Sequence, residues 1–178
     1  MKGETKMFFK KNKKDKIKNW LDSMNIKHYT INSNLTVDVN GDVKLSDKNL
    51  TNIPVKFGKV TGNFYCDGNE LTSLKNVPIE VGKNFDCSYN KLTSLKGSPK
   101  EIGGTFKCVF NKLTTLKGSP DKVGKHFDCS YNLLENLKGV PKEIGGNFKC
   151  IVNVLSKNDV LNSKISEKVS GKIICDNA

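Results

Sequence analysis

A period of 21 residues runs through most of this sequence and constrains its fold more than any other feature. Five cysteines recur at this interval, at Cys66, Cys87, Cys108, Cys129 and Cys150. Phenylalanine, asparagine, leucine and a branched aliphatic residue recur in step with them. Such a fixed period predicts a solenoid, because one unit cannot bury an apolar face alone and must stack on its neighbours. We therefore expect six to seven 21-residue rungs, with residues 41–155 as the repeat region.

Each repeat unit supplies a suitable residue type for every part of one rung. In one unit, Phe85 and Cys87 alternate as in a strand, so both point inward. The amide of Asn90 is expected to point inward and bond backbone groups that would otherwise lack partners, as a ladder from rung to rung. Leu92 and Leu95 fill the interior, and a proline and a glycine then set an extended return and a tight bend. This pattern predicts a parallel β-sheet with an extended or turn-rich convex side.

The segment Cys87-Ser88-Tyr89-Asn90-Lys91-Leu92-Thr93-Ser94-Leu95 places an asparagine between a strand and two leucines. It resembles the leucine-rich repeat. The short period and the proline-marked return are similar to the compact repeats of effectors secreted by bacterial pathogens. Phenylalanine and cysteine in the strand resemble repeat proteins of tailed bacteriophages and large DNA viruses. The resemblance covers residues 41–155 and implies a curved parallel sheet that serves as a protein-binding surface.

The residues before the repeats are expected to cover the first rung. An amphipathic helix is predicted over Lys13 to Asn25. Its apolar face consists of Ile17, Trp20, Leu21 and Met24. Leu35-Thr36-Val37-Asp38-Val39 followed by Asn40-Gly41 predicts a hairpin with the strand Asp42 to Leu45. A helix-plus-hairpin cap is thus expected within residues 13–40.

Residues 156–178 are expected to form an irregular cap at the other end. The segment from Lys168 to Cys175 echoes that from Glu143 to Cys150, displaced by 25 residues rather than 21. This echo predicts a closing strand near Ile173, after a four-residue insertion.

The chain is strongly basic, with a formal net charge of +12, and all 30 basic residues are lysine. Such a charge attracts nucleic acid, anionic lipid or an acidic protein surface, but the lack of arginine argues against base-specific recognition. We expect residues 1–12 to form a basic flexible tail; an anchor for nucleic acid or an acidic partner, and a membrane-surface segment, are the alternatives. Apolar stretches are too short for a signal-peptide core or a membrane span, so a cytoplasmic location is expected.

The cysteines and histidines are not expected to form a catalytic or metal site. One cysteine per rung makes a line with neighbours about 4.8 Å apart, which cannot converge on a tetrahedral zinc ion. Disulfides between stacked parallel strands would be strained, so the five repeating cysteines are expected to be small buried hydrophobes and Cys175 the most exposed one. His28 and His126 lie in different parts of the predicted fold. We therefore expect no enzyme activity, no cofactor and no metal.

Two columns of outward residues are the candidate binding site. The first alternates in charge, so neighbouring side chains are expected to neutralise one another. It contains Tyr65, Asp86, Lys107, Asp128 and Lys149. The second lies in the turn and contains Tyr89, Phe110 and Tyr131, flanked by Val109, Ile151 and Val152. Either these rings pack within the turn itself, or they form an exposed strip of the kind that protein interfaces favour.

We expect a non-enzymatic protein-interaction module that binds its partner on these columns. The phage-type resemblance implies a host defence or regulatory protein as the partner, bound and inhibited in the host cytoplasm. The alternative is a basic nucleic-acid-associated protein that acts through its lysine-rich surface. Salt distinguishes the two, because lysine–phosphate binding weakens steeply between about 50 and 200 mM salt.

Overall fold

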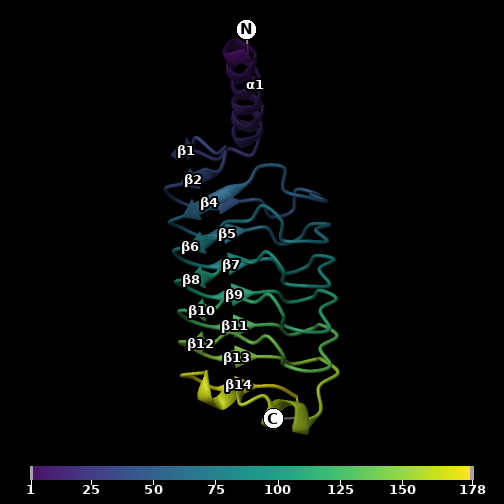
Figure 1. Cartoon of the computed structure of the whole chain (residues 1–178). Helices are drawn as coiled ribbons and strands as arrows, with labels where there is room; N and C mark the ends of the chain where they lie inside the picture. The colour runs from purple at the N-terminus through teal and green to yellow at the C-terminus, as the bar shows by residue number, and fades with distance from the viewer. Residues whose placement is uncertain (1, 177–178) are drawn as a thin grey trace.

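The chain folds into a β-solenoid with two sheets (Figure 1). The computed structural model describes residues 2–176, without the side chains of residues 2–10. The first sheet contains β1 (Tyr29–Ile31), β2 (Val37–Val39), β4 (Phe57–Val60), β6 (Glu80–Val81), β8 (Glu101–Ile102), β10 (Lys122–Val123) and β12 (Glu143–Ile144). The second contains β3 (Val43–Lys44), β5 (Phe64–Tyr65), β7 (Phe85–Asp86), β9 (Phe106–Lys107), β11 (Phe127–Asp128), β13 (Phe148–Lys149) and β14 (Ile173–Ile174).

The strands of the repeats stack in parallel with the register that the period requires. Phe85 of β7 pairs with Phe106 of β9, and Glu80 of β6 pairs with Glu101 of β8. Because each step in register is one period, equivalent side chains of successive rungs lie directly above one another. The predicted repeat solenoid is confirmed, with seven strands in each sheet.

The return segment of each rung forms a regular sheet of its own, where the sequence predicted an extended or turn-rich side. Gly82 N donates to Val60 O at 2.9 Å, and Gly103 N donates to Val81 O at 2.9 Å. A Cβ added at Gly82 would lie 2.2 Å from the carbonyl oxygen of Thr61 in the rung before. The glycine is therefore required by the close approach of neighbouring rungs.

The interior consists of columns of identical side chains. The phenylalanine rings of consecutive rungs stack with centroids 5.0 to 5.6 Å apart. Burial holds the pKa of the cysteine thiols well above the ordinary value. This applies to Cys66, Cys87, Cys108 and Cys129. These four thiols stay protonated and pack as small apolar side chains, as predicted.

The asparagine column forms the predicted ladder. Asn90 Nδ2 donates to Cys87 O of its own rung at 3.2 Å and to Cys66 O of the rung before at 3.0 Å. Its Oδ1 accepts a hydrogen bond from Leu71 N at 2.9 Å. One side chain thus satisfies backbone groups of two rungs inside the solenoid, where water cannot replace it.

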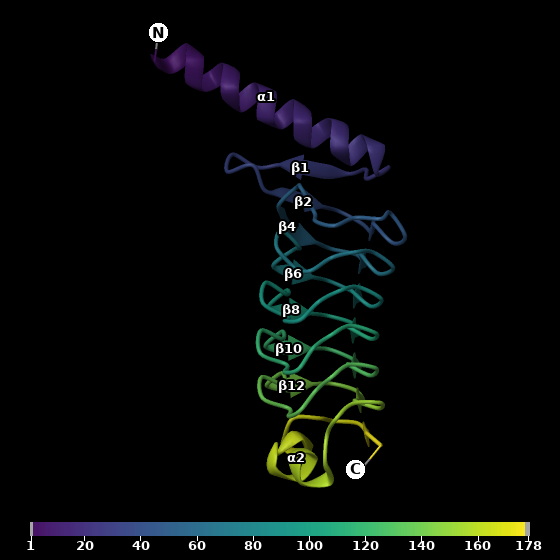
Figure 2. The ribbon, with the colours of Figure 1, turned by 90° about the vertical axis from the view of Figure 1, so that its right-hand side faces the viewer.

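The helix α1 (Lys2–Ser23) lies across the first end of the solenoid, above β1 (Figure 2). Leu21 is fully buried, and the ring of Trp20 meets that of Phe57 edge to face, with centroids 6.4 Å apart. The predicted cap helix is present. It begins at Lys2, so the segment expected as a flexible tail is part of α1, and the side chains of residues 2–10 lie outside the described part.

The hairpin of the cap has different partners from those predicted. β1 pairs with β2 in antiparallel orientation, whereas the strand after Asn40-Gly41 is β3, which pairs with β5 in the other sheet. The predicted pairing of residues 35–39 with residues 42–45 is wrong, because Asn40-Gly41 forms a corner between the two sheets. Val39 and Val43 are both buried, so this corner lets the chain bury one valine in each sheet.

The C-terminal cap contains α2 (Lys157–Asn162), a short 3-10 helix (Ile165–Glu167) and the closing strand β14. Phe148 of β13 pairs with Ile173, which confirms the predicted displaced strand. The Ser156 side chain and Asp159 form a reciprocal capping box that starts α2. Val160 and Ile165 are buried and cover the last rung.

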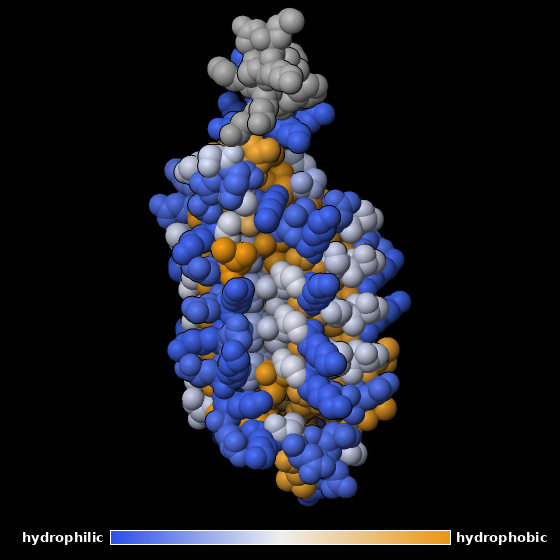
Figure 3. Space-filling model, in the orientation of Figure 1, coloured by the Kyte–Doolittle hydropathy of each residue, from blue (hydrophilic) through white to orange (hydrophobic). Residues whose placement is uncertain are grey.

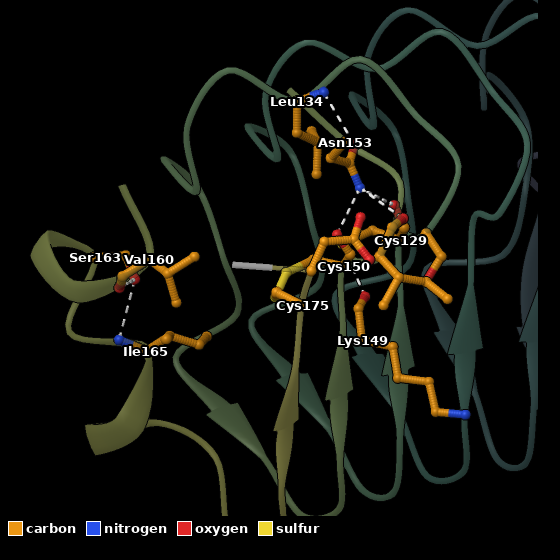
Figure 4. Close-up of a disulfide and its surroundings, with 12 residues drawn as sticks. Cys129, Leu134, Lys149, Cys150, Asn153, Val160, Ser163, Ile165 and Cys175 are labelled. Carbon is orange, nitrogen blue, oxygen red and sulfur yellow. Dashed lines mark hydrogen bonds between the residues drawn. A yellow bond between two sulfur atoms is a disulfide. The ribbon is translucent and has the colours of Figure 1, made fainter. Parts of the chain in front are cut away.

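A disulfide joins Cys150 to Cys175 (Figure 4). The expectation that Cys150 would be a free thiol is therefore wrong, whereas Cys175 is, as predicted, the most exposed of the six cysteines. The pairing of Lys149 with Ile174 places the two cysteines in register, with Cα atoms 4.7 Å apart, within the range that disulfides span.

Candidate interaction surface

The aromatic column lies on an exposed turn that follows the second sheet in each rung. Tyr89, Phe110 and Tyr131 are 59%, 41% and 39% exposed. Their rings stack face to face, with centroids 4.7 Å apart between the first two and 4.2 Å apart between the last two. Because the rings cover one another's faces, the column presents ring edges to the solvent.

Each ring of this column stands on a left-handed backbone. The φ angles of Tyr89, Phe110 and Tyr131 are 53°, 52° and 55°. The two preceding rungs carry Asp47 (φ 55°) and Gly68 (φ 63°) at this place, residue types that tolerate the conformation. A bulky side chain there costs roughly 1–2 kcal/mol. The fold therefore requires the left-handed turn but not the rings.

In the rungs that carry the rings, the asparagine ladder holds the left-handed turn in place. Asn90 Nδ2 donates to Ser88 O at 3.1 Å, which turns the asparagine back over the strand that it follows. Tyr89, between these two residues, takes the positive φ and donates its N–H to Val109 O at 2.8 Å. The side chain of Tyr89 is consequently directed away from the core.

The exposed apolar surface is larger than the three predicted rings. Val152 continues the column with φ 52°, and Leu133 and Val154 are exposed beside it. We define the aromatic ridge as Tyr89, Phe110, Tyr131, Leu133, Val152 and Val154. The flanking residues Val109 and Ile151, predicted as binding residues, are half-buried.

A change along one column of the repeat could have revealed Leu133 and Val154. Two residues after the left-handed position, the earlier rungs carry Glu70, Lys91 and Lys112, and the later rungs carry these two apolar residues. The ridge thus widens toward the C-terminal rungs.

The charged column does not form the ion pairs expected of it. Asp86 accepts a hydrogen bond from Ser88 N at 2.9 Å, and Asp128 accepts one from Ser130 N at 3.1 Å. Within residues 11–176 no ion pair joins these carboxylates to Lys107 or Lys149. The expectation was wrong because a carboxylate two residues before a free backbone N–H bonds it locally. Burial raises the pKa of Asp86, although the charge of Lys107 still acts to lower it.

The same column lines a groove with a volume of about 310 Å³ on the outer face of the second sheet. Its members Tyr65, Asp86, Lys107, Asp128 and Lys149 all line it. Asn84, Thr105, His126 and Asn147 line it as well. Figure 3 shows bands of hydrophilic side chains that run along the stack of rungs, with a paler band between two of them.

His126 takes part in a second ladder of side chains, which sequence reasoning missed. Its Nδ1 accepts a hydrogen bond from Asn147 N at 2.9 Å, and Asn84 Oδ1 accepts one from Thr105 N at 2.8 Å in the same column. His126 is exposed, as expected for an outward position. In the described part of the chain, no group of three or more histidine, cysteine or acidic residues is arranged to hold a metal ion.

None of the helices in the described residues is long and apolar enough to cross a bilayer. No protein-family model, no curated protein and no solved structure matches the chain. The described geometry of the exposed columns is therefore the basis for assigning a function.

Proposed function

We propose that this chain is a non-enzymatic protein-binding module whose partner docks on the aromatic ridge. The observation that carries the proposal is the placement of bulky side chains at left-handed positions where Asp47 and Gly68 serve the same turn. Strained residues of this kind persist where the side chain has a use. Exposed aromatic residues are the usual anchors of protein interfaces.

The ridge suits an apolar protein surface better than nucleic-acid bases. A base stacks on the face of a ring, but Phe110 has Tyr89 and Tyr131 on its two faces at 4.7 and 4.2 Å. Ring edges and the aliphatic side chains of Leu133 and Val154 remain available for packing.

The leucine-rich-repeat-like unit, with phenylalanine and cysteine in its strand, resembles repeat proteins of tailed bacteriophages and supports a more specific proposal. On this basis we propose a host defence or regulatory protein as the partner, met in the host cytoplasm. Lys107 and Lys149, which no ion pair within residues 11–176 neutralises, lie beside the ridge column in sequence and favour acidic residues on the partner.

The proposal is tested by capture from host extract with paired variants. Phe110→Gly combined with Tyr131→Gly removes two anchors and relieves two left-handed strains, so the fold is retained and partner capture should fall at least about tenfold. The matched control is Ile79→Ala with Leu161→Ala, two exposed apolar residues that are not part of the ridge. Capture that survives the ridge variant, or falls equally in both, rejects the ridge as the docking site.

A further inference from the structure

Four lysines project from one corner of the solenoid, one in each of four consecutive rungs. They are Lys75, Lys96, Lys117 and Lys138, and all four are exposed. We call them the lysine row. In each rung the lysine directly follows the second of the two interior leucines, which separate it from the aromatic ridge in the sequence.

A β-turn presents each of these lysines to the solvent. Around Lys96 the turn closes by a hydrogen bond from Ser98 N to Leu95 O at 3.0 Å, and Gly97 has a φ of 93°. This is the arrangement of a type II turn, in which the third residue needs a positive φ and the second accepts most residue types. A Cβ on Gly97 would lie 3.0 Å from Leu74 O of the rung before. The turn therefore constrains the glycine and leaves the lysine free to vary.

The lysine row is a run of four like charges on consecutive rungs. Elsewhere opposite charges meet across rungs, as in Lys59–Glu80 at 2.8 Å and Lys122–Glu143 at 2.9 Å. No member of the row forms an ion pair within residues 11–176. Neighbouring rungs are about 4.8 Å apart, where like charges repel and destabilise the stack. An anion bound along the row would remove this repulsion.

The surroundings of the row favour an extended anionic ligand. The residue two positions before each lysine is small and polar: Ser73, Ser94, Thr115 and Asn136. The nearest acidic residue in sequence is Glu135, three positions before Lys138. Hydroxyl and amide groups beside lysines are common ligands of phosphate oxygens.

We propose that the lysine row binds the phosphodiester backbone of single-stranded nucleic acid, independently of the aromatic ridge. One phosphate per rung requires a rise of about 4.8 Å, whereas each strand of a duplex rises about 3.4 Å per phosphate and would drift by roughly 4 Å over three steps. A flexible single strand adjusts its spacing. Lysine is a point charge without the fork that reads bases, so binding is independent of sequence.

The test is the salt dependence of binding to a fluorescent oligothymidylate, followed by anisotropy between about 50 and 200 mM salt. Lys75→Gln, Lys96→Gln, Lys117→Gln and Lys138→Gln are combined in one variant. The control variant removes the same charge elsewhere, through Lys48→Gln, Lys83→Gln, Lys112→Gln and Lys125→Gln, all at exposed lysines. The row variant should melt at or above the wild-type temperature, because it removes the like-charge repulsion, and the control variant should not melt below the wild-type temperature.

The row variant should lower the slope of log affinity against log salt by about 3, since each lost contact on a single strand contributes about 0.7. The control variant should lower it by less than about 1. Equal losses in the two variants would assign binding to diffuse net charge and overturn the proposal. Row-dependent binding to vesicles of anionic phospholipid, without binding to the oligonucleotide, would overturn it in favour of a membrane surface. The ridge variant Phe110→Gly, Tyr131→Gly should bind the oligonucleotide as wild type does.

Discussion

At the scale of single residues, stacking one rung on the next turns each position of the repeat into a column. A column whose residue serves the fold stays constant, as Phe106 and Asn111 show, while a column that only fills space on the surface changes from rung to rung. The left-handed position changes from Asp47 and Gly68 to Phe110 and its neighbours. A change toward a conformationally costlier residue marks a position that serves something other than stability.

This argument predicts that substitutions at two neighbouring phenylalanines change the free energy of unfolding by very different amounts. Phe110→Gly loses two ring stacks, worth about 0.5–1.5 kcal/mol each. It also relieves the strain of a bulky residue in the left-handed conformation, which stabilises the fold by roughly 1–2 kcal/mol. Its free energy of unfolding should therefore stay within about 1 kcal/mol of the wild-type value. Phe106→Ala, in the fully buried column, should cost about 3–5 kcal/mol. Urea titrations of both variants measure these changes. A large loss of unfolding free energy in Phe110→Gly would show that the ring of Phe110 serves the stability of the fold.

A second prediction concerns the asparagine ladder. Asn111 Nδ2 donates to Cys87 O at 3.0 Å, and its Oδ1 accepts from Leu92 N at 2.9 Å. Asn111→Ala leaves these buried backbone groups without a hydrogen-bond partner, so the free energy of unfolding should fall by about 3 kcal/mol or more. Asn136→Ala is the matched control, because this exposed side chain accepts one bond, from Lys138 N. Thermal unfolding that shows equal losses in the two variants would contradict the ladder's role.

At the scale of elements, the period determines the stacking of rungs but not the course of the chain between them. A step of 21 residues predicts that Phe85 lies on Phe106, whatever the path between the two strands. The hairpin at Asn40-Gly41 was mispredicted because a local turn signal fits a hairpin and a corner equally well. Burial of both Val39 and Val43 in the core favours the corner over the hairpin, and local turn propensity carries no information about this burial.

The candidate site was predictable to the same degree. Tyr89 was identified as outward from its place in the repeat, since the asparagine after it points inward. The absence of an ion pair between Asp86 and Lys107 was not predictable in this way, because it depends on a competing local donor to the carboxylate, Ser88 N. Column positions follow from the period, whereas side-chain partners depend on distances that only the structure gives.

The closing disulfide gives a prediction for the C-terminal cap. Cys150 and Cys175 are separated by 25 residues, and cross-linking a loop of this length stabilises the folded state by about 3 kcal/mol on chain-entropy grounds. Reduction should therefore speed amide hydrogen exchange in residues 157–176, including α2, before it affects β5 to β11. Cys175→Ala should show the same exchange with and without reductant. Unchanged exchange after reduction of the wild-type chain would show that packing of Val160 and Ile165 holds the cap by itself.

At the scale of the whole molecule, the solenoid places equivalent side chains of successive rungs in lines. The contributions of the side chains in one line to binding or to stability therefore add up. The lysine row and the aromatic ridge are two lines exposed to solvent. The free thiols Cys66, Cys87, Cys108 and Cys129 form a third, inside the core. Because all four have a pKa held well above the ordinary value by burial, they act together on the stability of the chain at alkaline pH.

The sign of this effect follows from proton linkage. In the unfolded chain a thiol releases its proton near pH 8.5, whereas in the folded chain it keeps the proton to a much higher pH. The stabilisation is therefore complete below about pH 8.5 and is lost as pH rises above it. Each ionised thiol adds a slope that approaches about 1.4 kcal/mol per pH unit.

The prediction is a steep alkaline loss of stability between about pH 8.5 and 9.5, before lysine and tyrosine side chains titrate. It is measured by urea unfolding at several pH values in a Cys150→Ala, Cys175→Ala background, where the four buried thiols are the only cysteines left. Adding Cys108→Ala should lower overall stability at neutral pH through the lost side-chain volume, yet make the alkaline slope shallower by about a quarter, since one of four thiols is gone. A slope that Cys108→Ala leaves unchanged would mean that another group controls the alkaline transition.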